Sequence, residues 1–310
     1  MRLFQKKITV IFFSTFLFLV IFKYQIYSDD FYIDYIGELD TVLNHIQIES
    51  KKDIIARIDL ASLFYAYPGM CIGISVDKDD IYLLMANGKR ILYDDHKVKS
   101  YLEEMENADL QDMLAQPYPL GKVQEDPLED FNPGGGRQID FFKAVYGRDK
   151  NKSIENLTEV FFLGKTVLFN KKNGAAAALK QISAELSAAV RKKPYLKKYI
   201  LPLGGTFNWR TVAGAKRLSP HAFGIAIDLN SKRGIYWQWE TTGKNVFQSR
   251  QNYPIEIIDI FEKNNFIWGG KWFFYDLMHF EYRPEIFIKS RITIQLFLRC
   301  FFQFSLLFSI

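Results

Sequence analysis

Two short polar stretches hold the side chains best suited to chemistry. One runs from His221 to Asp228 and the other from Asp276 to His279, so they contain two of the four histidines in the chain. Two imidazoles and one carboxylate are a common ligand set for a catalytic zinc ion, which keeps one position open. A further carboxylate beside that position can take a proton from water and return it to a leaving amine. The pattern indicates a metal-dependent hydrolase in which Asp276 is the acid–base.

The first stretch has the alternation of a strand entered from a turn. Side chains point to opposite faces along a strand. Gly224, Ala226 and Asp228 therefore share one face, and the isoleucines between them face the core. Small residues leave room above that face, so His221 can fold back over it. A carboxylate at the end of an apolar run also needs a partner if it is buried.

The second stretch predicts a strand in which His279 and Glu281 lie on one face, with Asp276 near its start. Two roles for Glu281 remain open. It can hydrogen-bond a ligand histidine from behind, or it can be a strand carboxylate paired elsewhere. The chain contains no His-Glu-x-x-His sequence, so a zinc site carried on one helix is excluded.

Helices and short strands around these stretches must hold them in place. Pro254 suits the first turn of a helix, and the Ala-rich run at 175–191 has high helix propensity. Helices mixed with short, irregularly spaced strands predict an α+β fold. The helices are expected at 175–191 and 254–264, and the strands at 158–163, 165–169, 223–229, 265–268 and 277–282.

The region before residue 140 has a different pattern. Asn87-Gly88 between two apolar runs predicts a hairpin formed by 81–85 and 90–93. Residues 97–115 are expected to be helical. The Pro- and Gly-rich passage that follows predicts loops, with a turn at the triple glycine 134–136. No Gly-Lys-Ser/Thr follows those glycines, so they do not form a phosphate loop.

The N-terminal end has the features of an export signal. A basic start precedes the apolar run 8–22, which predicts that the N-terminus stays cytoplasmic and the body is exported. No small-residue cleavage site follows, which favours a membrane anchor over a removed signal. The stretch 292–310 is also almost wholly apolar. A second membrane segment, an interfacial helix and a tail without a role all remain open for it.

The overall composition is that of a globular protein. The chain has 310 residues, 48% of them hydrophobic, and a net charge of +5. This excludes disordered, collagen-like and disulfide-stapled classes. The basic excess is spread thinly, so no nucleic-acid partner is expected. The two cysteines, Cys71 and Cys300, form no disulfide framework.

The motifs Ser-x-His-x-x-Gly-x-Ala-x-Asp at 219–228 and Asp-x-x-His at 276–279 resemble those of the M15 metallopeptidases. These zinc enzymes cleave peptidoglycan peptides as D-alanyl-D-alanine carboxypeptidases, dipeptidases or L-alanyl-D-glutamate endopeptidases. Further similar stretches are Gly204–Arg210, Lys216–Ser219, Trp268–Trp272 and His279–Tyr282. The resemblance covers about 127–286 and reaches neither apolar end.

The resemblance implies a role for each residue of the site. It makes His221, Asp228 and His279 zinc ligands, and it puts Asp276 in the place of the catalytic acid–base. Many relatives have Glu there and endopeptidase-like members have Asp, which leaves the cleaved bond open. Arg210 takes the place of an arginine that engages the substrate carbonyl or carboxylate. Ser219 either holds the site or binds substrate.

The resemblance also implies a small central antiparallel sheet flanked by helices, as in the hedgehog/DD-peptidase-like fold. We divide the chain into a signal peptide or membrane anchor at 1–29, a helical and hairpin region at 30–120, a zinc peptidase domain at 121–290 and an apolar tail at 291–310. The oligomeric state cannot be inferred from the sequence.

The activity expected from the resemblance is hydrolysis of peptidoglycan stem peptides, in the manner of a D-alanyl-D-alanine carboxypeptidase. An L-alanyl-D-glutamate-type endopeptidase and a non-catalytic wall-binding protein are the alternatives. The expected location is the cell envelope or periplasm, with the N-terminal segment either removed or anchored in the inner membrane.

Overall fold

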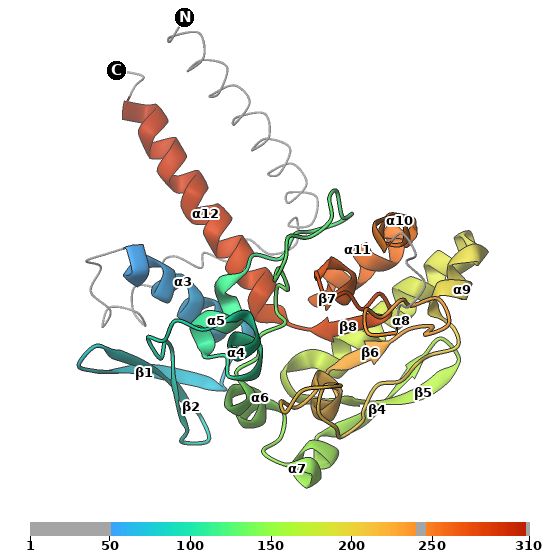
Figure 1. Ribbon diagram of the computed structural model, residues 1–310, viewed down its shortest axis with the longest axis horizontal. Coiled ribbons are helices and arrows are strands. Elements are labelled where there is room, and N and C mark those ends of the chain that lie inside the picture. Colours follow the sequence, from blue (N-terminus) through green and yellow to red (C-terminus); the bar gives the residue numbers. More distant parts are fainter. Residues whose placement is uncertain (1–50, 240–245, 308–310) are drawn as a thin grey trace, which may run out of the picture. The chain divides into compact units, whose positions relative to one another are not determined.

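The computed structural model describes residues 51–239 and 246–307. The predicted signal or anchor segment 1–29 lies outside these residues. In the described part, helices and short strands are mixed along the chain, and every strand ladder is antiparallel (Figure 1). The predicted α+β class is therefore confirmed. None of the described helices has both the length and the apolar character that spanning a membrane requires.

The first described elements are a helix and a three-stranded sheet. Helix α3 (Lys51–Ala66) precedes β1 (Cys71–Asp77), β2 (Asp80–Met85) and β3 (Arg90–Leu92), which pair in the order β1-β2-β3. Strands β2 and β3 form the predicted hairpin around the Asn-Gly turn.

The long C-terminal helix α12 (Pro284–Leu307) packs along α3. Two buried polar contacts hold the pair together. Lys289 forms an ion pair with Asp59 at 2.5 Å, and the Tyr67 hydroxyl donates to Glu285 at 2.7 Å. The predicted apolar tail, as far as Leu307, therefore continues a helix that begins inside the folded body.

The predicted helix at 97–115 is wrong in one respect, because the chain there forms two helices. Helix α4 (Tyr101–Glu106) ends before α5 (Leu110–Ala115) begins. The break is explained by Asp109, whose carboxylate accepts the backbone N–H of Asp112 at 2.8 Å and so caps the second helix. A capping aspartate in the middle of a helical pattern starts a new helix.

The Pro- and Gly-rich passage leads to α6 (Ile139–Tyr146) and α7 (Lys150–Glu155). The triple glycine forms the predicted turn, and Gly134 adopts a positive φ of 76°. A side chain there would meet Ile267 and Ile286 at 2.7 Å. Glycine is therefore required where this turn packs against the body.

A second hairpin consists of β4 (Leu157–Phe162) and β5 (Lys165–Asn170), close to the predicted strands. Helix α8 (Ala175–Lys192) packs against it and matches the predicted helix 175–191 (Figure 1). The short helix α9 (Lys197–Ile200) follows.

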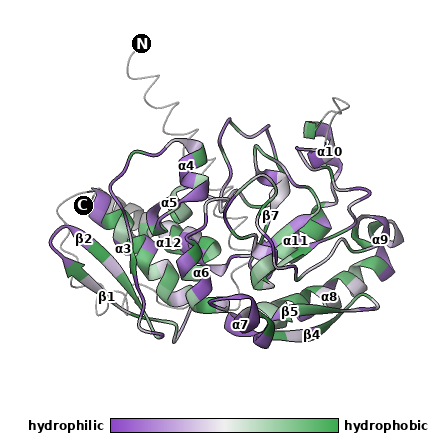
Figure 2. Cartoon of the chain, turned by 60° about the horizontal axis from the view of Figure 1, so that its bottom comes forward, coloured by the Kyte–Doolittle hydropathy of each residue, from purple (hydrophilic) through white to green (hydrophobic). Residues whose placement is uncertain are grey.

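The third sheet has the order β6-β8-β7, with β6 at Ala226–Asp228, β7 at Phe266–Trp268 and β8 at His279–Tyr282. Helix α10 (Val246–Asn252) precedes α11 (Ile255–Lys263), which contacts α8 and β7. Helix α11 has a polar and an apolar side (Figure 2). Its apolar side covers the core beside this sheet, as the pattern at 254–264 predicted.

A buried ion pair fastens α11 to the turn after β7. The Lys271 ammonium donates to Glu262 and to the Pro119 carbonyl, and Glu262 also accepts from Tyr118 and Gly121. Both charged side chains are almost completely buried. Removing one partner would leave an uncompensated buried charge.

We therefore expect Lys271→Met to lower the free energy of unfolding by about 3–5 kcal/mol, because Glu262 stays buried without its cation. The matched control is Lys263→Met. Lys263 is largely exposed and lies 3.8 Å from Glu185, so its loss should change stability by less than about 0.5 kcal/mol. Urea unfolding of both variants measures the difference. Equal stability of the two variants would contradict the role of the buried pair.

Candidate metal centre and active site

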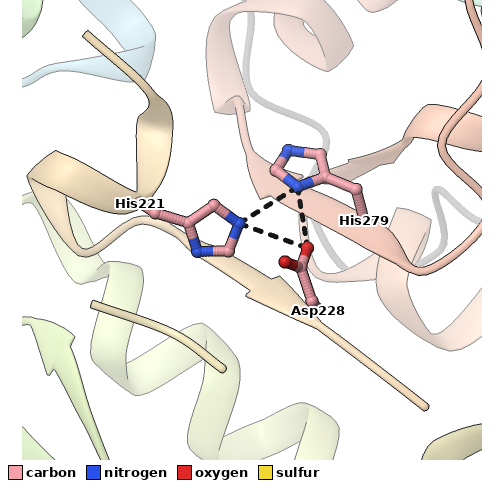
Figure 3. Close-up of side chains that lie close together, drawn as sticks. All are labelled: His221, Asp228 and His279. Atoms are coloured by element: carbon pink, nitrogen blue, oxygen red, sulfur yellow. Dashed lines mark hydrogen bonds and ion pairs between the residues drawn. The ribbon is translucent and has the colours of Figure 1, made fainter. Parts of the chain in front are cut away.

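Three side chains converge at the β6–β8 ladder (Figure 3). Asp228 Oδ1 lies 3.2 Å from His221 Nε2 and 3.0 Å from His279 Nδ1, and the two ring nitrogens are 3.3 Å apart. Both histidines are buried. The ladder accounts for part of this geometry, because Asp228 stands directly opposite His279 in the pairing register.

The approach to β6 differs from the predicted strand at 223–229. Residues Pro220–Phe223 form a 3₁₀ turn, and the strand begins only at Ala226. The Ser219 hydroxyl accepts the His221 N–H at 3.3 Å and caps this turn. Gly224 ends the turn with a φ of +66°, so it does not lie on the strand face. The turn, rather than a continuous strand, brings His221 back over Asp228.

The ring of His221 is held by the backbone behind it. Its Nδ1 lies 2.5 Å from the Thr206 carbonyl oxygen, which can only accept a hydrogen bond. The proton therefore sits on Nδ1, and the Nε2 lone pair faces Asp228 and His279. The segment before Thr206 pairs with Asp228 through Gly204 and Gly205. A Cβ on Gly204 would lie 2.9 Å from the Asp228 Cβ, so this close approach requires glycine.

Glu281 forms a buried ion pair with an arginine, and it also lies behind the His279 ring without a hydrogen bond to it. Its Oε2 lies 3.5 Å from His279 Nε2, and its two oxygens accept from Arg137 at 2.9 and 2.6 Å. Arg283 approaches it at 3.3 Å. Arg137 was not found from the sequence, because it stands in a loop 144 residues before Glu281 and belongs to no motif.

Asp276 lies beside the three side chains, at the entry to β8. Its Oδ1 is buried and has no hydrogen-bond partner among the described residues. Burial raises the pKa of this carboxyl to about 7, although His279 nearby acts in the opposite direction. A carboxyl with a pKa near neutrality can both accept and donate a proton at neutral pH. The predicted acid–base residue therefore has a suitable environment.

Charges within the cluster shift two further pKa values. Burial alone would raise the pKa of Asp228, but the two histidines outweigh it and hold that pKa well below its usual range. Burial would lower the pKa of His279, but the hydrogen bond to Asp228 and the nearby carboxylate of Glu281 raise it to about 9. Without a metal ion, the charge of the carboxylates is thus balanced by a protonated histidine.

Arg210 and Ser219 line the same cavity as the cluster and Asp276, which has a volume of about 550 Å³. The backbone N–H of Ser219 donates to the Arg210 carbonyl at 3.0 Å, so the two predicted substrate-binding residues are neighbours. The Arg210 side chain is exposed, with one hydrogen bond to the Thr211 carbonyl. It is available for a substrate, whereas the Ser219 hydroxyl holds the 3₁₀ turn.

Aromatic residues and helix α4 form another part of the cavity wall. Glu106 on α4 accepts the backbone N–H groups of Lys216 and Arg217 and pairs with the Arg217 guanidinium at 2.8 Å. These contacts hold the loop between Arg210 and Ser219 against α4. The aromatic residues that line the cavity are Tyr101, Tyr236, Trp237, Trp239, Trp272 and Phe274.

The donor set fits a zinc ion. His221, Asp228 and His279 each offer one ligand atom, and these atoms lie within 4.8 Å of one another. Two imidazole nitrogens and one carboxylate oxygen leave a fourth position of a tetrahedral site open. The carbonyl behind His221 and the carboxylate behind His279 are the supporting groups that ligand histidines normally have.

Comparison with protein families agrees with this geometry. Residues 213–282 match a family model described as D-alanyl-D-alanine carboxypeptidase. This match supports the resemblance to the M15 peptidases over that segment. The matched segment contains His221, Asp228, Asp276 and His279, whereas Arg210 lies just outside it. No curated protein and no solved structure gave a significant match to the chain.

We expect zinc binding at pH 7 to release about one proton, because a ligand histidine must be neutral and the pKa of His279 is about 9 without metal. The ring is protonated below that pKa and neutral above it. Apparent zinc affinity should therefore rise about tenfold per pH unit up to pH 9 and then level off. Titration calorimetry in buffers of different ionisation enthalpy counts the protons. Binding at pH 7 without proton release would contradict the assignment of His279.

Proposed function

We propose that the protein is a zinc-dependent peptidase that hydrolyses peptidoglycan stem peptides, in the first place as a D-alanyl-D-alanine carboxypeptidase. The observation that carries the proposal is the presence of three metal-ligating side chains, Asp276 and Arg210 in one cavity. The family match over 213–282 supports peptidase activity.

Each residue of the site has a separate role in the proposed reaction. A bound zinc ion would polarise the scissile carbonyl and make water more acidic. Asp276 takes the proton from the attacking water and delivers it to the leaving amine. The Arg210 guanidinium binds the terminal carboxylate of the substrate or the oxygen on which negative charge develops. Ser219 keeps His221 in place through the 3₁₀ turn.

An L-alanyl-D-glutamate-type endopeptidase is the second candidate. Two observations favour it: the acid–base residue is Asp276, as in the endopeptidase-like relatives, and the cavity of about 550 Å³ has an aromatic wall that can contact a longer substrate. A non-catalytic wall-binding protein is less well supported, because that function does not require a buried carboxylate oxygen without a partner beside a ligand set.

The site of action follows from the sequence of the N-terminal end. The basic residues and apolar run before residue 23 favour export to the envelope or periplasm, with the membrane contacted through this segment. Peptidoglycan peptides are then the accessible substrate, and the proposal includes no nucleic-acid partner. Cell fractionation of the full chain, followed by protease accessibility, tests this location.

Asp276→Ala should keep zinc and lose about 10²–10⁴-fold in kcat, because the proton acceptor is removed while the ligands stay. Metal analysis together with hydrolysis of purified muropeptides, followed by mass spectrometry, measures both properties. The control is Asp140→Ala, which alters an exposed carboxylate that does not line the cavity. Wild-type hydrolysis by the Asp276 variant would rule out this acid–base.

Arg210→Ala should raise KM strongly for stem peptides that end in a free carboxylate, if the enzyme is a carboxypeptidase. Peptides blocked by amidation at the C-terminus should be poor substrates of the wild type and should lose little more in the variant. An endopeptidase would instead cleave both peptides at an internal bond. Masses of the products distinguish the two activities.

A further inference from the structure

A chain of buried charges stands behind the ligand His279. Glu281 is completely buried on β8, and Arg137 is almost completely buried in the loop before α6. Placing two charges in the interior is costly unless they are paired and hydrogen-bonded. This buried pair therefore needs either a structural or a functional reason. Its position next to His279 favours a functional one.

Arg137 holds the Glu281 carboxylate in one orientation. Its Nε and Nη2 donate to the two carboxylate oxygens, at 2.9 and 2.6 Å, and its Nη1 donates to the Gly135 carbonyl at 3.0 Å. A two-point contact fixes the plane of a carboxylate as well as its distance. The Gly135 carbonyl thus helps to hold Arg137 in place. Glycine is required at this turn, because a Cβ at Gly135 would lie only 2.9 Å from the Asn132 carbonyl.

The fixed carboxylate faces the rear of the His279 ring. His279 Nε2 is buried and has no hydrogen-bond partner among the described residues, and Glu281 Oε2 lies 3.5 Å from it. An acceptor at this position favours the tautomer with its proton on Nε2. The lone pair of Nδ1 then faces His221 and Asp228, as a ligand requires.

We propose that Arg137 is a positioning residue that sets metal affinity by holding Glu281 against His279. The proposal rests on the metal site of the proposed function. Arg283 cannot replace Arg137, because it reaches Glu281 through one nitrogen at 3.3 Å while its Nε is bonded to Glu285. Loss of Arg137 thus leaves the carboxylate free to turn away from the ring.

The same network supplies an internal control. Arg283 donates to Glu285, which also accepts a hydrogen bond at 2.7 Å from the hydroxyl of Tyr67, the residue that follows α3. Tyr67 is completely buried and belongs to the same network, but it has no contact with the ligand histidine. If the network were purely structural, substitutions at Tyr67 and at Arg137 would change the zinc affinity by similar amounts.

The test measures zinc affinity of the full chain by competition with a chromophoric chelator, well below the melting temperature. Arg137→Gln and Glu281→Gln should each weaken zinc binding by about 10–100-fold. Tyr67→Phe should lower the melting temperature and leave the affinity within about threefold. Arg217→Gln removes another arginine that lines the cavity, partly exposed and paired with Glu106 instead of Glu281, and it should also leave the zinc affinity within that range.

The absorption spectrum of the cobalt-loaded protein gives a second readout, since a turned histidine changes the ligand field. It should change in the Arg137 and Glu281 variants and stay unchanged in the Tyr67 variant. Zinc affinity within threefold of wild type in folded Arg137→Gln overturns the proposal, as does an equal loss in Tyr67→Phe. If Arg137→Gln does not fold, the zinc affinity of Arg137→Lys tests the proposal instead, because lysine keeps the charge and loses the two-point contact.

These outcomes separate this proposal from the proposed function. A wild-type chain that binds zinc and cleaves no peptide refutes the peptidase and leaves the role of Arg137 to be decided by affinity. A wild-type chain that binds no zinc overturns both.

Discussion

The short ladder between β6 and β8 is the constraint on which the site depends. Only three residue pairs join these strands, and one of them is Asp228 with His279. A shift of one residue would turn every side chain of the strand to the opposite face. The buried isoleucine and phenylalanine at the middle pair oppose such a shift, because they would leave the core. Apolar packing therefore fixes the register, and the register places the ligands.

The sequence predicted which side chains come together better than it predicted the local backbone that carries them. The small residues and carboxylate of the first motif correctly indicated that His221 folds back over Asp228, but the strand proved shorter. Proline after a capping serine starts a 3₁₀ turn, and Gly224 ends it. That combination could have been recognised from the sequence. The strong periodicity of α8 and α11 explains why those helices were predicted almost to the residue.

The parts that Arg137 and helix α4 play at the site could not have been predicted in the same way. Each meets the site through a contact of more than 100 residues in sequence separation, and neither has a spacing that signals it. Local patterns report periodicity and turns, whereas a salt bridge across the fold depends on the tertiary arrangement. Glu281 showed this limit most clearly, because only the fold showed that a carboxylate paired with Arg137 also lies behind His279.

Helix α4 has a consequence for relationships between proteins. The three candidate metal ligands and Asp276 lie within 213–282, the segment that matches the family model, but α4 contributes Tyr101 and Glu106 to the cavity from far outside it. Chains that share these residues can therefore differ in the side of the cavity that α4 forms. Divergence in preferred substrate would then arise in a part of the chain that motif comparison does not reach.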